Sequence, residues 1–465
     1  MPWDHTALHL LTLEKGSDGF PTVAENRLIA TDASIYQPEF SPDGRYLTYS
    51  SDTSGFRQLY LHDLQTDEVR AITGAESGFE TEIAYRDQFD VGAEHGKPAW
   101  VQGGRVYGWQ NDSRHVMFIR NQEGFYDLWR VDIEQGMTTR IDGLDDYTFL
   151  DQLAVNQQNG AVAMIASSSQ IPARIISLDK AKEAKNARVH ARAMDEYVPF
   201  DALADAEPLR WRGEDGDLVY GLYFSPASTR YQSDGKPPLI VYIHVGPTAQ
   251  ASAEYDKRTQ YFATRGYGVL HVNYRGSTGY GRVYQDKLRG QWGVADVEDA
   301  ASGAQYLVDQ GRVDSEKLII LGSSAGGFTV FQSLVAKPGF YRAGVSLYGV
   351  SNQFLLAQDT HKFEAHYNDT LIGTLPEDAS LYRDRSPVFH VDKITDPVII
   401  FQGEDDTVVP KNQADSIVSS LRARGVTHEY HVYEGEGHSF RKPETIAHCH
   451  GAILDFLTQV VIYEG

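Results

Sequence analysis

Cysteine is nearly absent from this 465-residue sequence, because Cys449 is its single cysteine. One cysteine cannot form a disulfide within the chain, so the fold does not depend on an oxidising compartment. Long apolar runs are missing too, and none approaches the roughly 20 residues of a membrane-spanning helix. The N-terminus carries Asp4 and His5 where a signal peptide would carry Lys or Arg. We therefore expect a cytoplasmic protein without a membrane partner.

Positive charge is also scarce, with 42 Lys and Arg against 64 Asp and Glu, and the net charge is -22. Such a field repels phosphate backbones, so we expect no nucleic-acid partner. The hydrophobic content of 41% and the charged content of 23% are ordinary for a soluble globular protein. A chain of 465 residues exceeds one compact core, which predicts two domains.

The first part of the chain has a sequence pattern typical of antiparallel strands. Short alternating runs separated by turn residues extend from about residue 30 to about residue 180. Residues 45–52 and 57–64 flank "TSG", and residues 115–122 and 126–133 flank "EGF". Both patterns are typical of β-hairpins.

These segments also repeat. "QPEFSPDG" (37–44) resembles "KPAWVQGG" (97–104), and "GFRQLYLHD" (55–63) resembles "GFYDLWRVD" (124–132). A weaker third copy covers residues 160–180. Units of roughly fifty to seventy residues with about four short strands each are typical of β-propeller blades. A β-sandwich with coincidental similarity is the alternative.

Residues 181–204 are charged and Ala-rich, and we interpret them as a linker. From about residue 205 the chain alternates strand and helix patterns, which predicts an α/β domain with a largely parallel sheet. The predicted strands are 239–245, 267–274, 317–322, 343–350, 397–403 and 428–435. The predicted helices are 294–310, 326–337, 411–425 and 443–461.

The stretch "GSSAG" (322–326) follows the third of these strands and opens a helix. It fits G-x-S-x-G, in which the nucleophilic serine occupies a sharp strand-to-helix turn that leaves no space for side chains two positions away. Ser324 has glycine at both of those positions, whereas Ser323 has Leu321 two positions before it. Ser324 is therefore the candidate nucleophile.

A serine hydroxyl needs a base, and that base needs an acid that orients it. In folds with this turn the acid and then the histidine follow the serine in the chain. Glu404, Asp405 and Asp406 lie in the loop after the fifth predicted strand, and His438 lies in the loop after the sixth. Both loops leave the carboxyl edge of the sheet, where ligands bind. His438 is the candidate base, and spacing does not choose among the three acids.

The oxyanion formed during attack needs two fixed donors. One is expected to be the backbone N–H of Ala325, which follows the nucleophile at a helix N-terminus. The second is expected from the loop in "VYIHVGPTAQ" (241–250), where glycine followed by proline permits a close backbone approach and a stiff turn.

With these motifs the chain resembles the prolyl oligopeptidase family of serine peptidases, in its acylaminoacyl-peptidase and dipeptidyl-aminopeptidase-like branch. The stretches that carry the resemblance cover nearly all of 205–465 in order, with "SPDGRYLTYSSDTSG" (41–55) adding a propeller texture. They are "HVGPTA" (244–249), "NYRGSTGYGR" (273–282), "WGVADVEDA" (292–300), "GSSAGGF" (322–328), "SLYGVSN" (346–352), "THKFEAHY" (360–367), "QGEDDTVVP" (402–410) and "GEGHSFRKPE" (435–444).

The resemblance implies which acid completes the triad. In the family this aspartate lies three residues after the motif's glycine, Gly403 here, and two before the first valine, Val408, which gives Asp406. The second oxyanion donor that it implies is the N–H of Gly246. The chain departs from the family's His-Gly-Gly-Pro by carrying Val245 in place of the first glycine.

The resemblance also implies the fold class: an α/β-hydrolase domain over residues 196–465, preceded by an all-β propeller over residues 1–195. Family members carry a complete propeller, whereas about 200 residues here hold about three to four blades. We therefore expect an incomplete propeller and a chain that begins partway through it. Exposed strand edges would favour a homo-oligomer formed through the propeller edge or the hydrolase domain.

Three further positions are weaker candidates for substrate binding. Phe363 and Tyr367 lie where the family often builds its specificity pocket, although core packing explains them equally well. Glu94 is a candidate for binding a substrate amino group, or else a plain surface acid. The "HCH" at 448–450 lies on a predicted helix whose i and i+2 side chains point apart, which argues against a metal site.

Taken together, these patterns predict a serine peptidase with a Ser324, Asp406 and His438 triad, an acyl-enzyme intermediate and no cofactor. Its substrates are expected to be short peptides or acyl-peptides, cleaved near the N-terminus. A carboxylesterase of broad specificity with the same triad is one alternative. A non-catalytic fragment that acts as a binding module is another.

Overall fold

The structure is a computed structural model, and it forms two compact units, which are described separately. It describes residues 4–74, 80–81, 92–98, 103–179, 187–229, 235–359, 362 and 364–463. The first unit comprises Met1–Glu196, Ser252–Tyr255 and Thr278–Val283. The second comprises Tyr197–Ala251, Asp256–Ser277 and Tyr284–Gly465.

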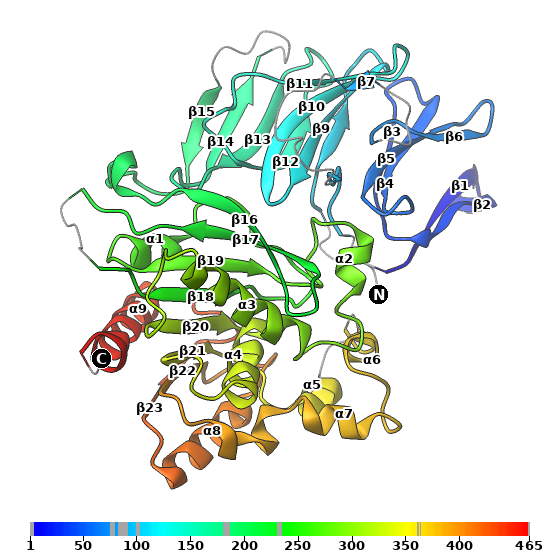
Figure 1. The fold of residues 1–465 in the computed structure, drawn as a ribbon. Helices are drawn as coiled ribbons and strands as arrows, with labels where there is room; N and C mark the ends of the chain where they lie inside the picture. The colour runs from blue at the N-terminus through cyan, green and yellow to red at the C-terminus, as the bar shows by residue number, and fades with distance from the viewer. Residues whose placement is uncertain are drawn as a thin grey trace. The chain divides into compact units, whose positions relative to one another are not determined.

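The described strands of the first unit form four small sheets (Figure 1). The two-stranded sheet contains β1 (Thr6–Lys15) and β2 (Pro21–Ala33). The second contains β3 (Ile35–Phe40), β4 (Tyr46–Ser51), β5 (Gln58–Asp63) and β6 (Glu68–Ala71). The third, in sheet order, contains β7 (Glu80–Thr81), β11 (Met137–Arg140), β10 (Phe125–Asp132), β9 (His115–Gln122) and β8 (Tyr107–Trp109). The fourth contains β12 (Phe149–Val155), β13 (Val162–Ser167), β14 (Arg174–Leu178) and β15 (Arg188–Arg192).

Successive sheets of this unit share apolar cores. One core joins Leu59 and Leu61 of β5 to Trp109 of β8 and Phe118 of β9. A second joins the third sheet to the fourth. Each sheet therefore buries one face against the next, as adjoining propeller blades do. Both predicted hairpins are confirmed, since β4 pairs antiparallel with β5 and β9 with β10.

The predicted linker over 181–204 is wrong for part of its length. Residues 188–192 form β15, which pairs antiparallel with β14 as the edge strand of the fourth sheet. An edge strand packs on one side only, and four of the five β15 residues are exposed. Their polar composition is therefore the same as that of a linker, and hydrophobic alternation could not reveal the strand.

The second unit contains one eight-stranded sheet. Its strands are, in sheet order, β16 (Ala206–Arg212), β17 (Leu218–Phe224), β19 (Gly268–Asn273), β18 (Leu239–Ile243), β20 (Leu318–Ser323), β21 (Ala343–Leu347), β22 (Val398–Gly403) and β23 (His428–Tyr433). From β19 to β23 every neighbouring pair is parallel, while β17 is antiparallel to both of its neighbours. The prediction of a largely parallel sheet with six of these strands is confirmed, and the β16–β17 hairpin was not predicted.

Helices cover both faces of this sheet (Figure 1). The helices are α1 (Lys257–Ala263), α2 (Arg282–Asp286), α3 (Ala295–Asp309), α4 (Ala325–Ala336), α5 (Gln353–Asp359), α6 (Tyr367–Leu371), α7 (Ala379–Asp384), α8 (Lys411–Arg424) and α9 (Pro443–Leu457), with α2 crossing the boundary between the units. Short helical turns are η2 (Phe200–Ala202), η3 (Pro387–Phe389), η4 (Val391–Lys393) and η5 (Thr458–Tyr463).

Neighbouring residues of β19 show which helices share a face. His271 bonds Thr259 of α1, whereas Leu270 lies against Gly303 of α3. Adjacent strand residues point to opposite faces, so α1 and α3 cover opposite sides. Helix α9 contacts α1 through aromatic rings, and α4 bonds α3. The sheet therefore lies between an α1–α9 layer and an α3–α4 layer.

Helix α9 continues into η5, and within this 21-residue stretch a window of 18 residues has a mean hydropathy of 1.3. By length and composition this helix could cross a membrane. Core helices of soluble proteins pass the same test. In the structure α9 packs on β22 and buries Cys449, Ile453 and Phe456. The helix thus contributes to the core of the second unit.

Candidate active site

The nucleophile candidate lies between a buried strand and a helix of the second unit. Ser324 follows β20 and is the N-cap of α4, with φ 54° and ψ -119°. This backbone region costs a non-glycine residue on the order of 1–3 kcal/mol and is found mainly at functional sites. The turn carries the side chain away from both the strand and the helix, as a nucleophile requires.

The glycines on either side of Ser324 are explained by close packing. A Cβ atom on Gly322 would lie 2.3 Å from the carbonyl carbon of Gly326. A Cβ atom on Gly326 would lie 2.4 Å from the carbonyl oxygen of Ile243 and 3.0 Å from that of His244. The turn therefore excludes side chains at both positions. The same packing brings the start of α4 next to the loop that begins at His244.

The structure places the base between the serine and one of the three acids. His438 Nε2 lies 2.9 Å from Ser324 Oγ, and His438 Nδ1 lies 2.9 Å from Asp406 Oδ2. The Asp406 side chain is fully buried, whereas that of His438 is 20% exposed. These distances allow a proton to pass from the serine to the imidazole while the carboxylate holds the ring. Glu404 and Asp405 are exposed.

Asp406 is itself held in a fixed orientation. Its Oδ1 accepts hydrogen bonds from the N–H groups of Val408 (2.9 Å) and Val409 (2.8 Å). Its Oδ2 faces His438 and also accepts a weaker bond of 3.3 Å from Gln402 Nε2. The surrounding donors therefore fix the direction in which each carboxylate oxygen points, and only Oδ2 can accept the imidazole N–H.

The two predicted oxyanion donors lie on adjacent segments. Ala325 is the first residue of α4, so its N–H belongs to the unpaired first turn of the helix. Gly246 follows β18 with φ 134°, which favours glycine. Val245, the departure from the family motif, is 49% exposed, so its side chain does not crowd the loop.

Comparison with known proteins agrees with this arrangement. A model of the prolyl oligopeptidase family matches residues 253–462, a stretch that contains Ser324, Asp406 and His438. The chain belongs to the prolyl oligopeptidase family.

Relatives in this family are similar in sequence and in structure. The chain is 31% identical over 261 residues to dipeptidyl aminopeptidase BIII of Pseudoxanthomonas mexicana, covering 54% of this chain and 38% of the relative. A crystal structure of puromycin hydrolase matches 99% of this chain and 66% of that one, with 32% identity and a TM-score of 0.87. A puromycin-hydrolyzing peptidase of Mycobacterium tuberculosis matches the same shares, with 31% identity and a TM-score of 0.88.

The predicted fold class is confirmed by these matches: an α/β-hydrolase domain preceded by propeller sheets. The chain spans 38% of the length of the aminopeptidase relative and 66% of each solved puromycin-hydrolysing relative.

In this prolyl oligopeptidase family member the twin serines have different partners. Ser323 Oγ accepts a hydrogen bond of 3.2 Å from Arg258 Nη1, which also donates to Tyr242 (2.9 Å). Ser323 thus faces the α1 side of the sheet, and Ser324 faces His438. The choice between the two serines, made from the flanking glycines, agrees with these contacts.

The three weaker candidates have different surroundings. Tyr367 is buried, and its hydroxyl donates to Thr248 Oγ1 and accepts from the Thr248 N–H (2.9 Å), two residues beyond Gly246. Phe363 lies outside the described residues. Glu94 belongs to the first unit, where its buried carboxylate accepts the N–H groups of Arg57 (2.6 Å) and Gly281 (3.0 Å). Their substrate-binding roles stay predictions.

Among the described residues, no group of three or more His, Cys, Asp and Glu side chains could hold a metal ion. The "HCH" residues have separate partners: His448 bonds Tyr433 (2.9 Å), and His450 bonds the carbonyl of Ile446 (2.7 Å). Cys449 is buried, and burial raises the pKa of its thiol to about 12.

Sequence reasoning missed the residues that hold the oxyanion loop. The ring of His244 stacks on Tyr274 at 4.4 Å between centroids, and its Nε2 lies 2.8 Å from Ser277 Oγ. Burial lowers the pKa of His244 to about 4, so this imidazole is neutral at pH 7. Tyr274 and Ser277 lie within "NYRGSTGYGR" (273–282), which was identified from the sequence only as one of the stretches that carry the family resemblance.

Proposed function

We propose that this chain is a serine peptidase that hydrolyses peptide or acyl-peptide bonds near the N-terminus of short peptides. The observation that carries the proposal is the placement of His438 at 2.9 Å from both Ser324 and Asp406. Membership of the prolyl oligopeptidase family supports it.

The geometry supports a two-step reaction. In the first step Ser324 Oγ attacks the carbonyl carbon while His438 Nε2 takes the hydroxyl proton, and Asp406 accepts the Nδ1–H of the resulting imidazolium. The N–H groups of Gly246 and Ala325 stabilise the oxyanion. His438 then gives its proton to the leaving nitrogen as the C–N bond breaks, which leaves an acyl-enzyme.

In the second step the same groups act on water. His438 removes a proton from a water molecule, whose oxygen attacks the ester carbonyl of the acyl-enzyme. The proton returns to Ser324 Oγ as the acyl–oxygen bond breaks, and the carboxylic acid product leaves. Each step uses only side chains and backbone groups of the second unit.

We infer further that a free α-amino group is preferred over a blocked one. Puromycin is an amide of an amino acid whose α-amino group is free, and the puromycin-hydrolysing relatives are 31 to 32% identical to this chain. Three solved acylaminoacyl peptidase structures are less similar, at 18 to 20% identity and TM-scores of 0.67 to 0.69. The stronger similarity favours the aminopeptidase type of substrate.

A panel of chromogenic substrates tests this proposal. We expect hydrolysis of aminoacyl-p-nitroanilides, with kcat/KM at least about 10-fold above that of the N-acetylated counterparts. This ratio corresponds to about 1.4 kcal/mol of preference for the free amine over the blocked one. Hydrolysis of p-nitrophenyl acetate without either anilide would instead indicate a carboxylesterase. Each rate should disappear in Ser324→Ala and persist in Ser323→Ala.

A further inference from the structure

The loop that carries Gly246 is held by one short segment, Asn273–Ser277, which begins at the last residue of β19. Tyr274 Oη donates to the carbonyl of Pro247 (2.8 Å), and the Tyr274 ring stacks on His244. Ser277 Oγ lies 2.8 Å from His244 Nε2. These contacts hold the loop on both sides of Gly246.

The same segment also holds the far end of the loop. Asn273 Oδ1 accepts the N–H of Ala251 (2.7 Å), and Asn273 Nδ2 donates to the carbonyl of Ala251 (3.0 Å). Tyr274, Asn273 and Ser277 are each at most 1% exposed. The position of the Gly246 N–H therefore depends on where this segment lies.

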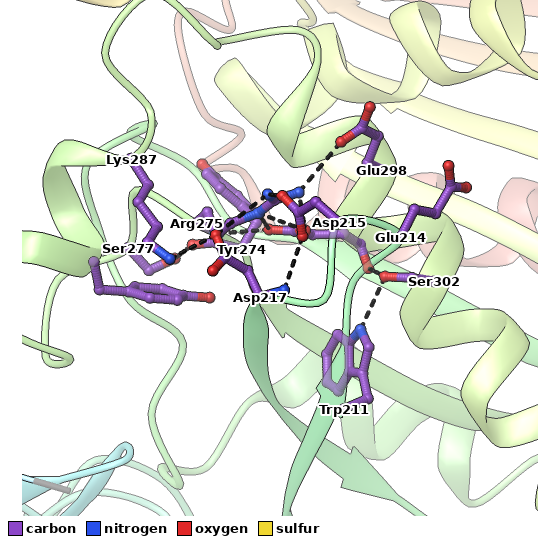
Figure 2. A network of polar contacts seen from close by, with 12 residues as sticks. Trp211, Glu214, Asp215, Asp217, Tyr274, Arg275, Ser277, Lys287, Glu298 and Ser302 are labelled. Atoms are coloured by element: carbon purple, nitrogen blue, oxygen red, sulfur yellow. Dashed lines mark hydrogen bonds and ion pairs between the residues drawn. The ribbon is translucent and has the colours of Figure 1, made fainter.

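Arg275, in the middle of the segment, ties it to a different part of the unit (Figure 2). Its backbone N–H donates to Asp299 Oδ2 (2.7 Å), and its Nε donates to Asp299 Oδ1 (2.9 Å). Its Nη1 pairs with Asp215, and its Nη2 lies 3.3 Å from Glu298 Oε2. The guanidinium thus joins the segment to α3 and to the β16–β17 turn.

These two partners form a fixed frame. Trp211 Nε1 of β16 donates to Ser302 Oγ of α3 (3.0 Å), so the hairpin and the helix are also bonded to each other (Figure 2). Lys287 pairs with Asp217 at 2.6 Å and closes the turn beside Arg275. The frame holds Arg275 from two directions.

The ion pair between Arg275 and Asp299 is buried, so it tolerates little change in geometry. The Arg275 side chain is 7% exposed and that of Asp299 is 0% exposed. Burial raises the pKa of Asp299, and the bonds from Arg275 oppose that rise. Removing Arg275 leaves the Asp299 carboxylate buried without a cation, and removing the Asp299 charge takes from Arg275 its fully buried partner and leaves only partly exposed ones. In either variant the segment would shift to relieve this.

Resting on the proposed function, we propose that Arg275, held by Asp299, is a positioning residue that sets the Gly246 N–H for the oxyanion. Arg275 touches no reacting atom. It fixes Asn273–Ser277, and that segment fixes the oxyanion loop through Tyr274, Ser277 and Asn273.

Labelling of Ser324 by a fluorophosphonate tests the proposal, because the reaction develops charge on an oxygen in the oxyanion hole. Both the rate constant and the final number of labels per chain are measured for the wild type, Arg275→Gln and Asp299→Asn. We expect the rate constant to fall about 10-fold or more with the full number of labels, since small misplacements of a donor are costly. With an aminoacyl-p-nitroanilide, kcat should fall similarly while KM changes less than about 2-fold.

Arg312→Gln is the matched control. Arg312 pairs with Glu207 through two bonds of 2.9 and 2.5 Å on the exposed side of β16, so this substitution also breaks an arginine–carboxylate pair. We expect wild-type labelling and wild-type kcat. A second variant, Tyr274→Phe, removes only the hydroxyl that bonds the Pro247 carbonyl, and we expect its rate constant to fall at least about 3-fold. This variant decides the outcome if Arg275→Gln does not fold.

Three results separate the possibilities. A wild-type rate constant in Arg275→Gln, or in Tyr274→Phe where that variant decides, overturns the positioning role. A reduced number of labels, with the remaining chains reacting at the wild-type rate, also overturns it, because that pattern reports lost structure alone. A wild type that takes no label overturns the proposed function itself.

Discussion

Asp406→Asn tests the triad most sharply, because the structure dictates how the new amide would sit. Asp406 Oδ1 accepts two backbone N–H groups, from Val408 and Val409. Only the oxygen of an asparagine can take that place, so its NH2 group must face His438. That NH2 would donate to His438 Nδ1 and so place the imidazole proton on Nε2. The base would then be unable to accept the proton of Ser324.

The expected loss follows from this change of tautomer. A base held in the wrong tautomer lowers kcat by about 10⁴-fold, equivalent to about 5.5 kcal/mol, while the geometry stays intact. The assay is kcat and KM on an aminoacyl-p-nitroanilide at pH 7, with circular dichroism to verify folding. Asp405→Asn is the matched control, since Asp405 is an exposed neighbour. Asp406→Asn with more than a tenth of wild-type kcat, or an equal loss in Asp405→Asn, would show that Asp406 does not set the tautomer of His438.

Three further predictions concern the surroundings of the triad. Tyr367→Phe leaves the Thr248 N–H without its acceptor, and we expect chemical denaturation to show a loss of about 1–3 kcal/mol in the free energy of unfolding. Burial raises the pKa of Asp296 to about 6, so the stability that its protonated form contributes is full below 3.8 and is lost as the pH rises through 6. Between pH 4 and pH 7 the stability of Asp296→Asn should therefore gain about 2 kcal/mol relative to wild type, whereas a constant difference would contradict the burial argument. In Gly322→Ala the new Cβ would overlap Gly326, so denaturation should show a loss of about 1–3 kcal/mol and fluorophosphonate labelling should fall sharply.

The second unit was the more predictable part of the fold. Its central strands are buried on both faces and read as continuous apolar runs, such as "LIILG" in β20. The β16–β17 hairpin was missed because it joins the sheet antiparallel at one edge, outside the alternation of strand and helix. In the first unit, β15 was missed because an exposed edge strand carries a linker-like composition.

The candidate site divides in the same way. Ser324 can be predicted from local sequence, since side chains at the flanking positions 322 and 326 would overlap neighbouring backbone atoms. The acid does not follow from spacing, because Glu404, Asp405 and Asp406 share one loop. The family resemblance implied Asp406, and in the fold this carboxylate faces His438. The positioning role of Arg275 was the hardest feature to predict from the sequence. Its partners on α3 and on the β16–β17 turn meet it only in three dimensions.

The proposed function requires that Ser324, and not its neighbour Ser323, is an activated nucleophile in this chain. Mass spectrometry of the protein after exposure to a fluorophosphonate measures it directly. We expect one label per chain, located on Ser324, retained in Ser323→Ala and absent from Ser324→Ala. An unlabelled wild type, or a label that persists in Ser324→Ala, would show that Ser324 is not the nucleophile.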